Sequence, residues 1–241
     1  MTHAARAIGA TKIYGEGPTA VRALDDVDLD IERGRFTSIM GPSGSGKSTL
    51  MHCLAGLDRL TSGQVLIGDT DLGELSDDEL TRIRRDRIGF VFQAYNLIPT
   101  LTAAENIQLP ARIARQELEP SWRDQVVDTL DLADRLDHRP TELSGGQQQR
   151  VAAARALVRR PEIVFADEPS GNLDTRSAGE LLTFLRGAVD DFGQTIVMVT
   201  HDPAAAAYSD RVVFLRDGRP VSELSAPTVE SILEGVKELE T

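Results

Sequence analysis

The sequence is poor in cysteine, in basic residues and in long apolar runs. It contains a single cysteine, Cys53, so no internal disulfide can form, and we expect a reducing compartment. No apolar run approaches the roughly 18 residues that span a membrane, and the N-terminus lacks the apolar core of a signal peptide. We therefore expect any association with a membrane to depend on a partner.

The charge balance is acidic. There are 26 Lys and Arg against 38 Asp and Glu, which gives a formal net charge of -12. A surface of this sign repels a phosphate backbone, so nucleic acid is excluded as a general partner. The 241 residues are 41% hydrophobic and 27% charged, as in ordinary folded domains, and they suffice for a substantial core without disulfides.

Short apolar runs rich in Ile, Val and Phe predict buried strands. They lie at 36–40, 88–92, 163–166 and 196–199. Such runs are typical of a parallel sheet covered on both faces, and the helical stretches between them indicate an α/β architecture. At 27–31 the apolar residues alternate with Asp28 and Asp30, which predicts an antiparallel strand with one wet face.

Helix starts replace strands between about residues 95 and 160. Thr102 and Glu105 form a capping-box pattern, and Pro120 opens another amphipathic stretch. Outside this region, Ser76 and Glu79 predict a capped surface helix at 77–87, and the turn at 216–219 predicts a hairpin.

We expect one domain over residues 1–241. Its α/β core, with a parallel central sheet and an N-terminal antiparallel β subdomain, takes residues 1–94 and 161–225. A helical subdomain is inserted at 95–160, and a C-terminal helix covers 226–241. In that helix Val229, Ile232, Leu233, Val236 and Leu239 recur at helical spacing, so we expect them to pack on their own domain.

A glycine-rich segment directly follows the predicted strand 36–40. It matches G-x-x-x-x-G-K-[ST] and precedes a helix-forming run, the context that this pattern requires. In such a loop the backbone N–H groups surround phosphates, Lys47 reaches the β- and γ-phosphates, and Ser48 binds Mg²⁺. An ordinary glycine-rich turn has no need of the Lys-Ser pair. The candidate nucleotide-binding residues are Gly41, Pro42, Ser43, Gly44, Ser45, Gly46, Lys47, Ser48 and Thr49.

Two carboxylates, Asp167 and Glu168, end the predicted strand 163–166. Burial of adjacent carboxylates is costly unless a cation or a proton transfer uses them. We therefore predict that Asp167 holds Mg²⁺, directly or through water, and that Glu168 is the general base for the water that attacks the γ-phosphate. An isolated Asp-Glu pair is usually a surface strand end, and the phosphate loop upstream is what favours the functional interpretation.

The segment Leu143-Ser144-Gly145-Gly146-Gln147 is a second candidate anion site. Ser144 is expected to cap a helix whose two glycines leave backbone N–H groups open. Alone this segment is weak evidence, but its position between the phosphate loop and the carboxylates makes the whole set specific.

With these motifs in this order, the chain resembles an ABC-type ATPase domain over nearly its whole length, which implies that the expected α/β core is a P-loop NTPase core. The resemblance implies a motor that binds and hydrolyses ATP with Mg²⁺. It also implies a head-to-tail homodimer with two ATP molecules between the subunits, each contacted by Ser144, Gly145, Gly146 and Gln147 of the opposite subunit.

The same resemblance assigns roles to four further residues. Tyr14 would stack on adenine, or on another purine, and Gln93 would sense Mg²⁺ and the attacking water. Asp174 ends a segment, 170–174, that would cross the dimer interface, and His201 would contact the γ-phosphate as a switch. Taken singly, Tyr14 also fits an exposed loop aromatic, and Gln93 and His201 fit strand caps.

The segments 94–106 and 168–174 resemble the lipoprotein-release, macrolide-export and cell-division branch of this family. This likeness implies an integral membrane permease as partner and a peripheral position at the cytoplasmic side of the inner or plasma membrane. We expect the apolar residues Tyr95, Leu97, Ile98 and Leu101 to form a partly exposed patch against that permease, although core packing is an alternative.

Other P-loop proteins carry motifs or insertions that differ from those of this sequence. A P-loop GTPase would need an [NT]-K-x-D element, which the sequence lacks, and a simple P-loop kinase would not need residues 143–147. Repair-type relatives would insert long coiled coils. The remaining alternative is a regulatory ATPase without transport that acts on a membrane complex, as in cell division.

Overall fold

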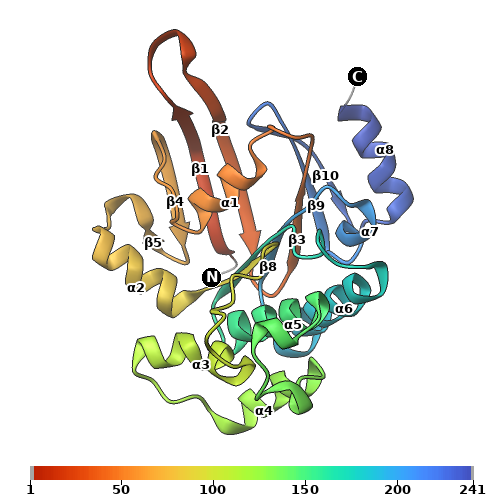
Figure 1. Ribbon diagram of the computed structural model, residues 1–241. Helices are drawn as coiled ribbons and strands as arrows, with labels where there is room; N and C mark the ends of the chain where they lie inside the picture. Colours follow the sequence, from red (N-terminus) through yellow and green to blue (C-terminus); the bar gives the residue numbers. More distant parts are fainter. Residues whose placement is uncertain (1–2, 240–241) are drawn as a thin grey trace.

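The computed structural model describes residues 3–239, which form two sheets and the helices around them (Figure 1). The first sheet is antiparallel, with the order β2-β1-β4-β5. Its strands are β1 (His3–Tyr14), β2 (Val21–Glu32), β4 (Ser62–Ile67) and β5 (Thr70–Asp71).

The second sheet is central and has the order β10-β9-β3-β8-β7-β6. Its first five strands along the chain are parallel, and β10 pairs antiparallel with β9. The strands are β3 (Phe36–Met40), β6 (Ile88–Phe92), β7 (Ile163–Asp167), β8 (Ile196–Val199), β9 (Arg211–Arg216) and β10 (Arg219–Ser225). The predicted bounds of β3, β6 and β8 are confirmed, and β7 is one residue longer. These strands are buried on both faces, as their apolar runs indicate.

The helices begin where the sequence supplies caps. Ser76, Thr102 and Ser144 each form a complete capping box, and Asp217 and Gly218 form the expected hairpin turn with positive φ angles. The helices are α1 (Lys47–Leu54), α2 (Asp77–Arg87), α3 (Ala103–Ala114), α4 (Pro120–Thr129), α5 (Gly145–Leu157), α6 (Thr175–Phe192), α7 (Pro203–Ala206) and α8 (Val229–Leu239). Short 3-10 turns lie at Gly17–Thr19, Leu72–Glu74, Ala133–Arg135 and Pro140–Glu142. The mixed α/β fold predicted from the sequence is confirmed.

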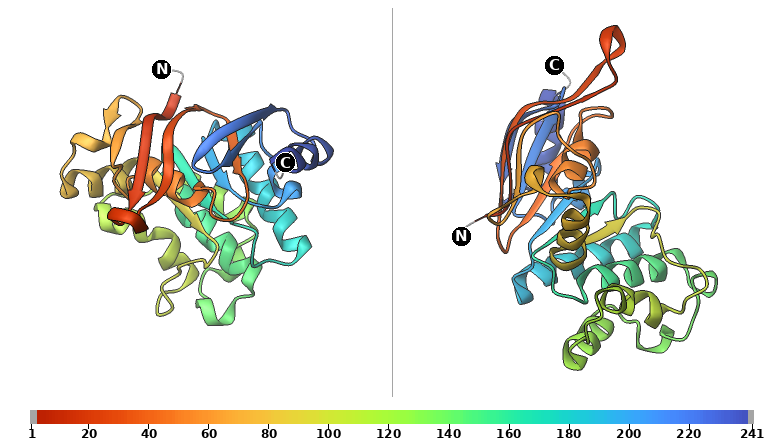
Figure 2. Two further views of the ribbon diagram at one scale, coloured as in Figure 1. Left: turned by 90° about the horizontal axis from the view of Figure 1, so that it is seen from above. Right: turned by 90° about the vertical axis from the view of Figure 1, so that its left-hand side faces the viewer.

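The two faces of the central sheet carry different helices. On one face α1 packs between the two sheets, where Leu50, Met51 and Leu54 are fully buried. On the other face α5 and α6 cover the sheet through a second apolar cluster that includes Val151 and Leu181 (Figures 1 and 2). The two helices that begin at the candidate anion sites, α1 and α5, therefore lie on opposite faces of one sheet.

The C-terminal helix packs on its own domain through only part of its apolar face. Ile232 and Leu239 are buried in a small cluster with Phe214, and Val236 is half-buried against it. Val229 and Leu233 are 37% and 44% exposed, so the expectation that all five residues pack inward is wrong for these two. Residues 240 and 241 of the predicted helix lie outside the described part of the chain. Between residues 3 and 239, no helix has the length and apolar character of a membrane span.

Candidate active site

The carboxyl ends of the parallel strands bring the predicted residues to one edge of the central sheet. Phe92 of β6 pairs with Asp167 of β7, and Asp167 pairs with Val199 of β8. Each of these strands is followed by one of the residues Gln93, Glu168 and Thr200. These three residues therefore lie next to one another at this edge of the sheet. The glycine-rich loop 41–46 leaves β3 at the same edge, which is where parallel α/β sheets bind ligands.

The glycine-rich loop needs glycine at its two ends. A Cβ on Gly41 would lie 2.0 Å from the Leu215 carbonyl oxygen, and one on Gly46 would lie 2.3 Å from the Ala23 carbonyl oxygen. Gly46 also has a φ of 99°, in the left-handed region that side chains disfavour. The backbone can therefore turn sharply directly before the first turn of α1, as a phosphate-binding loop at a helix N-terminus requires.

Lys47 is the first residue of α1 and folds over this loop. Its ammonium group donates to the carbonyl oxygens of Gly41 and Pro42, at 2.8 Å each. Burial lowers the pKa of Lys47, against the opposite effect of the carboxylates of Glu168 and Asp167. A partly buried cation over a glycine-rich loop at a helix N-terminus fits a phosphate chain.

Asp167, at the end of β7, is a carboxylate whose charge acts on the Lys47 ammonium group. Burial raises the pKa of Asp167, the neighbouring Glu168 raises it further, and His52 and Lys47 act in the opposite direction. Such a carboxylate favours an added cation. Together with the hydroxyl of Ser48 and the amide of Gln93, which the sequence also predicts as ligands, it would supply the oxygen atoms that Mg²⁺ prefers, in the small number usual for an ion that also binds phosphates. Among residues 3–239, no cluster of three or more His, Cys, Asp or Glu forms a metal site by itself.

Glu168 adopts a strained backbone conformation. Its φ is 45°, in the left-handed region that is uncommon for non-glycine residues. Two backbone hydrogen bonds hold it: the Glu168 N–H donates to the Val199 carbonyl at 2.9 Å, and the Gly171 N–H donates to the Glu168 carbonyl at 3.0 Å. The chain therefore turns sharply after β7.

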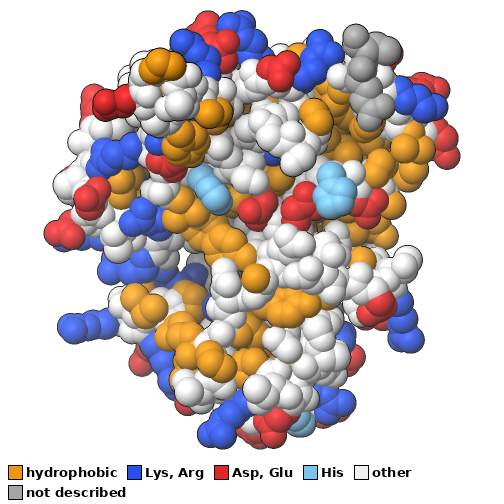
Figure 3. All heavy atoms as spheres, turned by 45° about the horizontal axis from the view of Figure 1, so that its top comes forward, with side chains coloured by type: hydrophobic (Ala, Val, Ile, Leu, Met, Phe, Trp, Pro, Cys, Tyr) orange, Lys and Arg blue, Asp and Glu red, His pale blue; other side chains and the backbone are white. Residues whose placement is uncertain are grey.

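The Glu168 carboxylate is held at both oxygens. His201 Nδ1 lies 2.8 Å from Oε1, and the Thr200 hydroxyl donates to Oε2 at 3.4 Å. The His201 side chain is 75% exposed, so it can meet a ligand from the solvent side. On the face shown in Figure 3, histidine side chains lie beside carboxylates in the middle of the molecule. The pairing of β7 with β8 thus brings two predicted catalytic residues together.

Gln93 is exposed and contacts the segment 170–174. Its amide Nε2 donates to Asn172 Oδ1 at 3.2 Å, and Asn172 Nδ2 donates to the Gln93 carbonyl at 3.0 Å. Asp174 lies at the end of this segment as the cap of α6, where it accepts hydrogen bonds from the N–H groups of Arg176 and Ser177 at 3.1 Å. The contact of Asn172 with Gln93 could not be predicted from the sequence, because it joins two separate loops.

Ser144 caps α5 as predicted. Its hydroxyl accepts from the Gln147 N–H at 3.3 Å, and its own N–H donates to Gln147 Oε1 at 2.9 Å. A Cβ on Gly145 would lie 2.9 Å from the Tyr95 hydroxyl and one on Gly146 would lie 2.7 Å from the Ser177 hydroxyl, so a side chain at either position would require these neighbours to shift. These residues stand on the α5 face of the sheet, away from the phosphate loop of their own chain.

Tyr14 lies at the end of β1 as a fixed, 42% exposed ring. Its hydroxyl donates to Asp58 at 2.6 Å, and Lys12, which also pairs with Asp58 at 2.6 Å, stands 4.8 Å from the ring centre. Burial and the hydrogen bond to Asp58 raise the pKa of Tyr14. Such a ring suits stacking on any purine. Asp58 and Lys12 were not found by sequence analysis, since neither belongs to a motif.

The apolar patch after Gln93 is partly exposed, as we expected. Ile98 is 38% exposed, whereas Tyr95, Leu97 and Leu101 are half-buried, and Leu97 packs against the main core cluster. Next to this segment lies a groove of about 410 Å³ between the central sheet and the helical region. It is lined chiefly by Phe90, Phe92, Asn96, Leu109, Pro110 and Ile113, with arginines at its rim.

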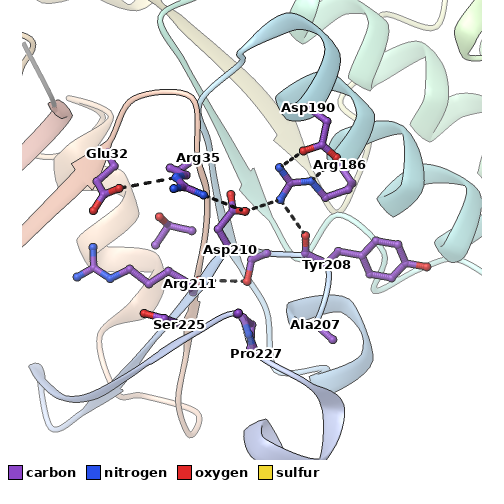
Figure 4. A pocket seen from close by; sticks show the side chains of 13 residues that line it. Glu32, Arg35, Arg186, Asp190, Ala207, Tyr208, Asp210, Arg211, Ser225 and Pro227 are labelled. Atoms are coloured by element: carbon purple, nitrogen blue, oxygen red, sulfur yellow. Dashed lines mark hydrogen bonds and ion pairs between the residues drawn. The ribbon is translucent and has the colours of Figure 1, made fainter.

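Another cavity, of about 710 Å³, lies at the opposite, amino-terminal ends of β3 and β9 (Figure 4). Its arginines are occupied by its own carboxylates: Asp210 lies 3.2 Å from Arg186 and 3.6 Å from Arg35, and Arg211 pairs with Glu223. The Asp210 carboxylate also accepts the Phe36 N–H at 2.8 Å. These charges fix the strand ends and do not form the phosphate site.

The comparison with known proteins agrees with this geometry. Residues 24–171 match the family model described as ABC transporter. An uncharacterized ABC transporter ATP-binding protein, MJ0796 of Methanocaldococcus jannaschii, is 46% identical over 214 residues, which cover 86% of this chain and 91% of that protein. The macrolide export ATP-binding/permease protein MacB of Hyphomonas neptunium is 46% identical over 215 residues.

The match to MacB covers 88% of this chain but only 33% of the relative, so the chain spans about a third of that protein. Among solved structures, a dimeric post-hydrolysis state of the MJ0796 cassette bound to ADP and Pi is similar with a TM-score of 0.82 and 42% identity, over 92% of this chain and 99% of that one. The family and branch indicated by the sequence motifs are confirmed. The chain therefore belongs to the ABC transporter family, as an ATP-binding cassette with ATPase activity that uses ATP and Mg²⁺.

Proposed function

We propose that this chain is the motor subunit of a transporter. Two copies bind two ATP molecules between them in a head-to-tail dimer, and the closing and opening of this dimer drive a separate membrane permease. The subunit would lie at the cytoplasmic face of the membrane through that permease. The α/β core at 1–94 and 161–225, the helical subdomain at 95–160 and the C-terminal helix at 226–241 would move as parts of one domain.

The proposal of a dimer rests on the positions of the two predicted nucleotide-binding segments. The phosphate loop precedes α1 on one face of the central sheet, and the Ser144 segment precedes α5 on the other face. A single chain therefore cannot bring both to one nucleotide. A second copy in head-to-tail orientation supplies the missing segment to each phosphate loop, and the dimeric cassette structure of MJ0796 supports this arrangement.

The residues at the edge of the sheet then have distinct tasks. The loop 41–46 with Lys47 binds the phosphate chain, and Ser48, Gln93 and Asp167 would hold Mg²⁺, which neutralises phosphate charge when bound. Glu168 accepts the proton of the attacking water. His201 and Thr200 orient the Glu168 carboxylate before ATP arrives, which places it without a large rearrangement.

The apolar groove beside Gln93 is the proposed seat of the permease. Its floor is formed by aromatic and aliphatic side chains, and Ile113, which lines it, is 63% exposed. The groove adjoins the segment that follows Gln93. A permease element bound there would therefore be coupled directly to the position of Gln93. The printed name of MacB, in which an ATP-binding part and a permease are joined, supports this partner.

Dimerisation tests the shared-site arrangement. In a Glu168→Gln background, which slows hydrolysis, ATP should produce a dimer in light scattering after size exclusion. Ser144→Arg should abolish that dimer without loss of ATP binding, since the arginine fills the anion site on the partner-facing helix. Ser76→Arg is the matched control, because Ser76 caps α2 with the same capping box. An unchanged dimer with Ser144→Arg would contradict the proposal.

The permease is tested at the groove. Ile113→Glu should weaken co-purification with a co-expressed candidate permease and remove the stimulation of ATP hydrolysis by that permease, while the free subunit keeps its own activity. Val221→Glu, at a residue 45% exposed on β10, is the control. Binding that survives Ile113→Glu would mean that the permease binds at another surface. A permease that activates an enzyme outside the membrane and moves no cargo would favour the regulatory alternative.

A further inference from the structure

One buried polar side chain in the centre of the molecule has no role in the site described so far. Gln149 lies in α5, two residues after the Ser144–Gln147 capping box, and is 0% exposed. Its amide Nε2 donates to the Pro169 carbonyl at 2.6 Å and to the Phe92 carbonyl at 3.2 Å. Pro169 directly follows Glu168, and Phe92 directly precedes Gln93. One amide group therefore holds the main chain next to two of the proposed site residues.

These contacts require two N–H donors at a fully buried position. Both partners are carbonyl oxygens, and the NH₂ group of Gln149 donates one hydrogen to each of them without burying a charge. The other end of the amide, Oε1, is buried and has no hydrogen-bond partner among the described residues. An unpaired buried acceptor is unfavourable, which indicates that the two donated bonds determine the orientation of the side chain.

A second residue of α5 holds the same loop farther along. Arg155 donates to the Asn96 carbonyl at 2.6 Å and to the Tyr95 carbonyl at 2.9 Å. Tyr95 and Asn96 have positive φ angles of 58° and 51°, so this turn is strained and needs such support. Hydrogen bonds from two side chains of α5 thus hold the main chain on both sides of Gln93.

We propose that Gln149 is a positioning residue that sets Gln93 and Glu168 relative to α5, and so relative to the Ser144 segment at the start of that helix. The inference rests on the proposed roles of Glu168 and Gln93. Gln149 does not touch the phosphate loop region in any described hydrogen bond, so its loss should disturb the placement of the hydrolytic groups and leave ATP binding intact.

The test is the ratio of turnover to binding in Gln149→Met, which keeps the length of the side chain and removes both donors. We expect kcat to fall by about tenfold or more, because small misplacements of catalytic groups reduce rates strongly. The KM for ATP and the Kd for trinitrophenyl-ATP should change by less than about threefold.

Gln194→Met is the matched control. Gln194 is also buried, at 8% exposure, and its Nε2 also donates to two carbonyls, those of Pro161 at 2.9 Å and Thr195 at 3.3 Å. It lies at the amino-terminal ends of β7 and β8, away from the site. Its substitution should lower the melting temperature about as much as Gln149→Met and leave kcat unchanged.

Gln149→Asn provides a second variant, since it keeps an amide at the same depth but is one methylene too short to reach both carbonyls. A wild-type kcat in whichever of the two variants folds, or an equal loss of kcat in Gln194→Met, would overturn the positioning role. An unchanged kcat in Glu168→Gln would instead show that the proposed roles themselves are wrong.

Discussion

The sharpest prediction concerns the Glu168 carboxylate. Glu168→Gln keeps the shape of the side chain and an oxygen that can face His201, but it removes the group that accepts a proton. General-base catalysis contributes roughly 10²–10⁴-fold to enzymatic rates. We therefore expect kcat to fall by that factor, equivalent to about 2.7–5.4 kcal/mol of lost transition-state stabilisation.

Binding should survive this change because the phosphate loop, Lys47 and Asp167 are unaltered. Steady-state phosphate release gives kcat, and light scattering with ATP and then with ADP gives the assembly, for which we expect a dimer and a monomer respectively. Glu162→Gln is the control at the opposite end of β7, where Glu162 pairs with Arg87 and Arg33 and should not affect kcat. A Glu168→Gln protein that hydrolyses ATP within a few fold of wild type, or stays monomeric in saturating ATP while wild type turns over, refutes the reasoning.

Three further predictions follow from single residues. Lys47→Ala should abolish tight ATP binding and hydrolysis, since it removes the cation above the loop; ATP titration and phosphate release would show this, and near wild-type turnover would mean that another cation suffices. Cys53 is buried and burial raises its pKa to about 12, so at pH 8 its thiolate fraction is roughly a thousandfold below that of a free cysteine, and N-ethylmaleimide should label it only after unfolding. Hydrogen bonds from Arg87 and Arg33 outweigh burial and lower the pKa of Glu162, so its stabilisation is present above about pH 4.3 and is lost as the pH falls through the lowered pKa. Glu162→Gln should therefore reduce the unfolding free energy by about 1 kcal/mol at pH 7 and by progressively less as the pH falls through the lowered pKa, as measured by denaturant titration.

The sequence predicted those parts of the fold in which local pattern and burial agree. Strands β3 and β8 are buried along their whole length, so their apolar runs end where the strands end. The sequence of β1 predicts a strand less clearly because it is rich in alanine and contains Gly9. In the structure Gly9 has a φ of 55°, and β1 shifts register against β2. Its pairing depends on partners that are distant in the sequence.

The site was predictable where one short segment carries the chemistry, as in the loop before Lys47. The contacts that orient this chemistry were not. The bond between His201 and Glu168 depends on the register of β7 against β8, and the contact of Gln93 with Asn172 depends on two loop conformations. Gln149 offered one usable signal: it falls on the same face of α5 as the buried Ala153 and Ala156, where an unpaired polar residue would be unfavourable.

The placement of α1 and α5 on opposite faces of one sheet has a kinetic consequence. With the proposed shared site, an isolated chain binds nucleotide but lacks residues 144–147 of the second copy, which complete the site. Hydrolysis by the free cassette is then second order in protein at low concentration, and its specific activity rises on concentration until the dimer is saturated. A dilute subunit in the cell would consume little ATP, and a membrane partner that holds two copies together would raise their effective concentration and with it the rate.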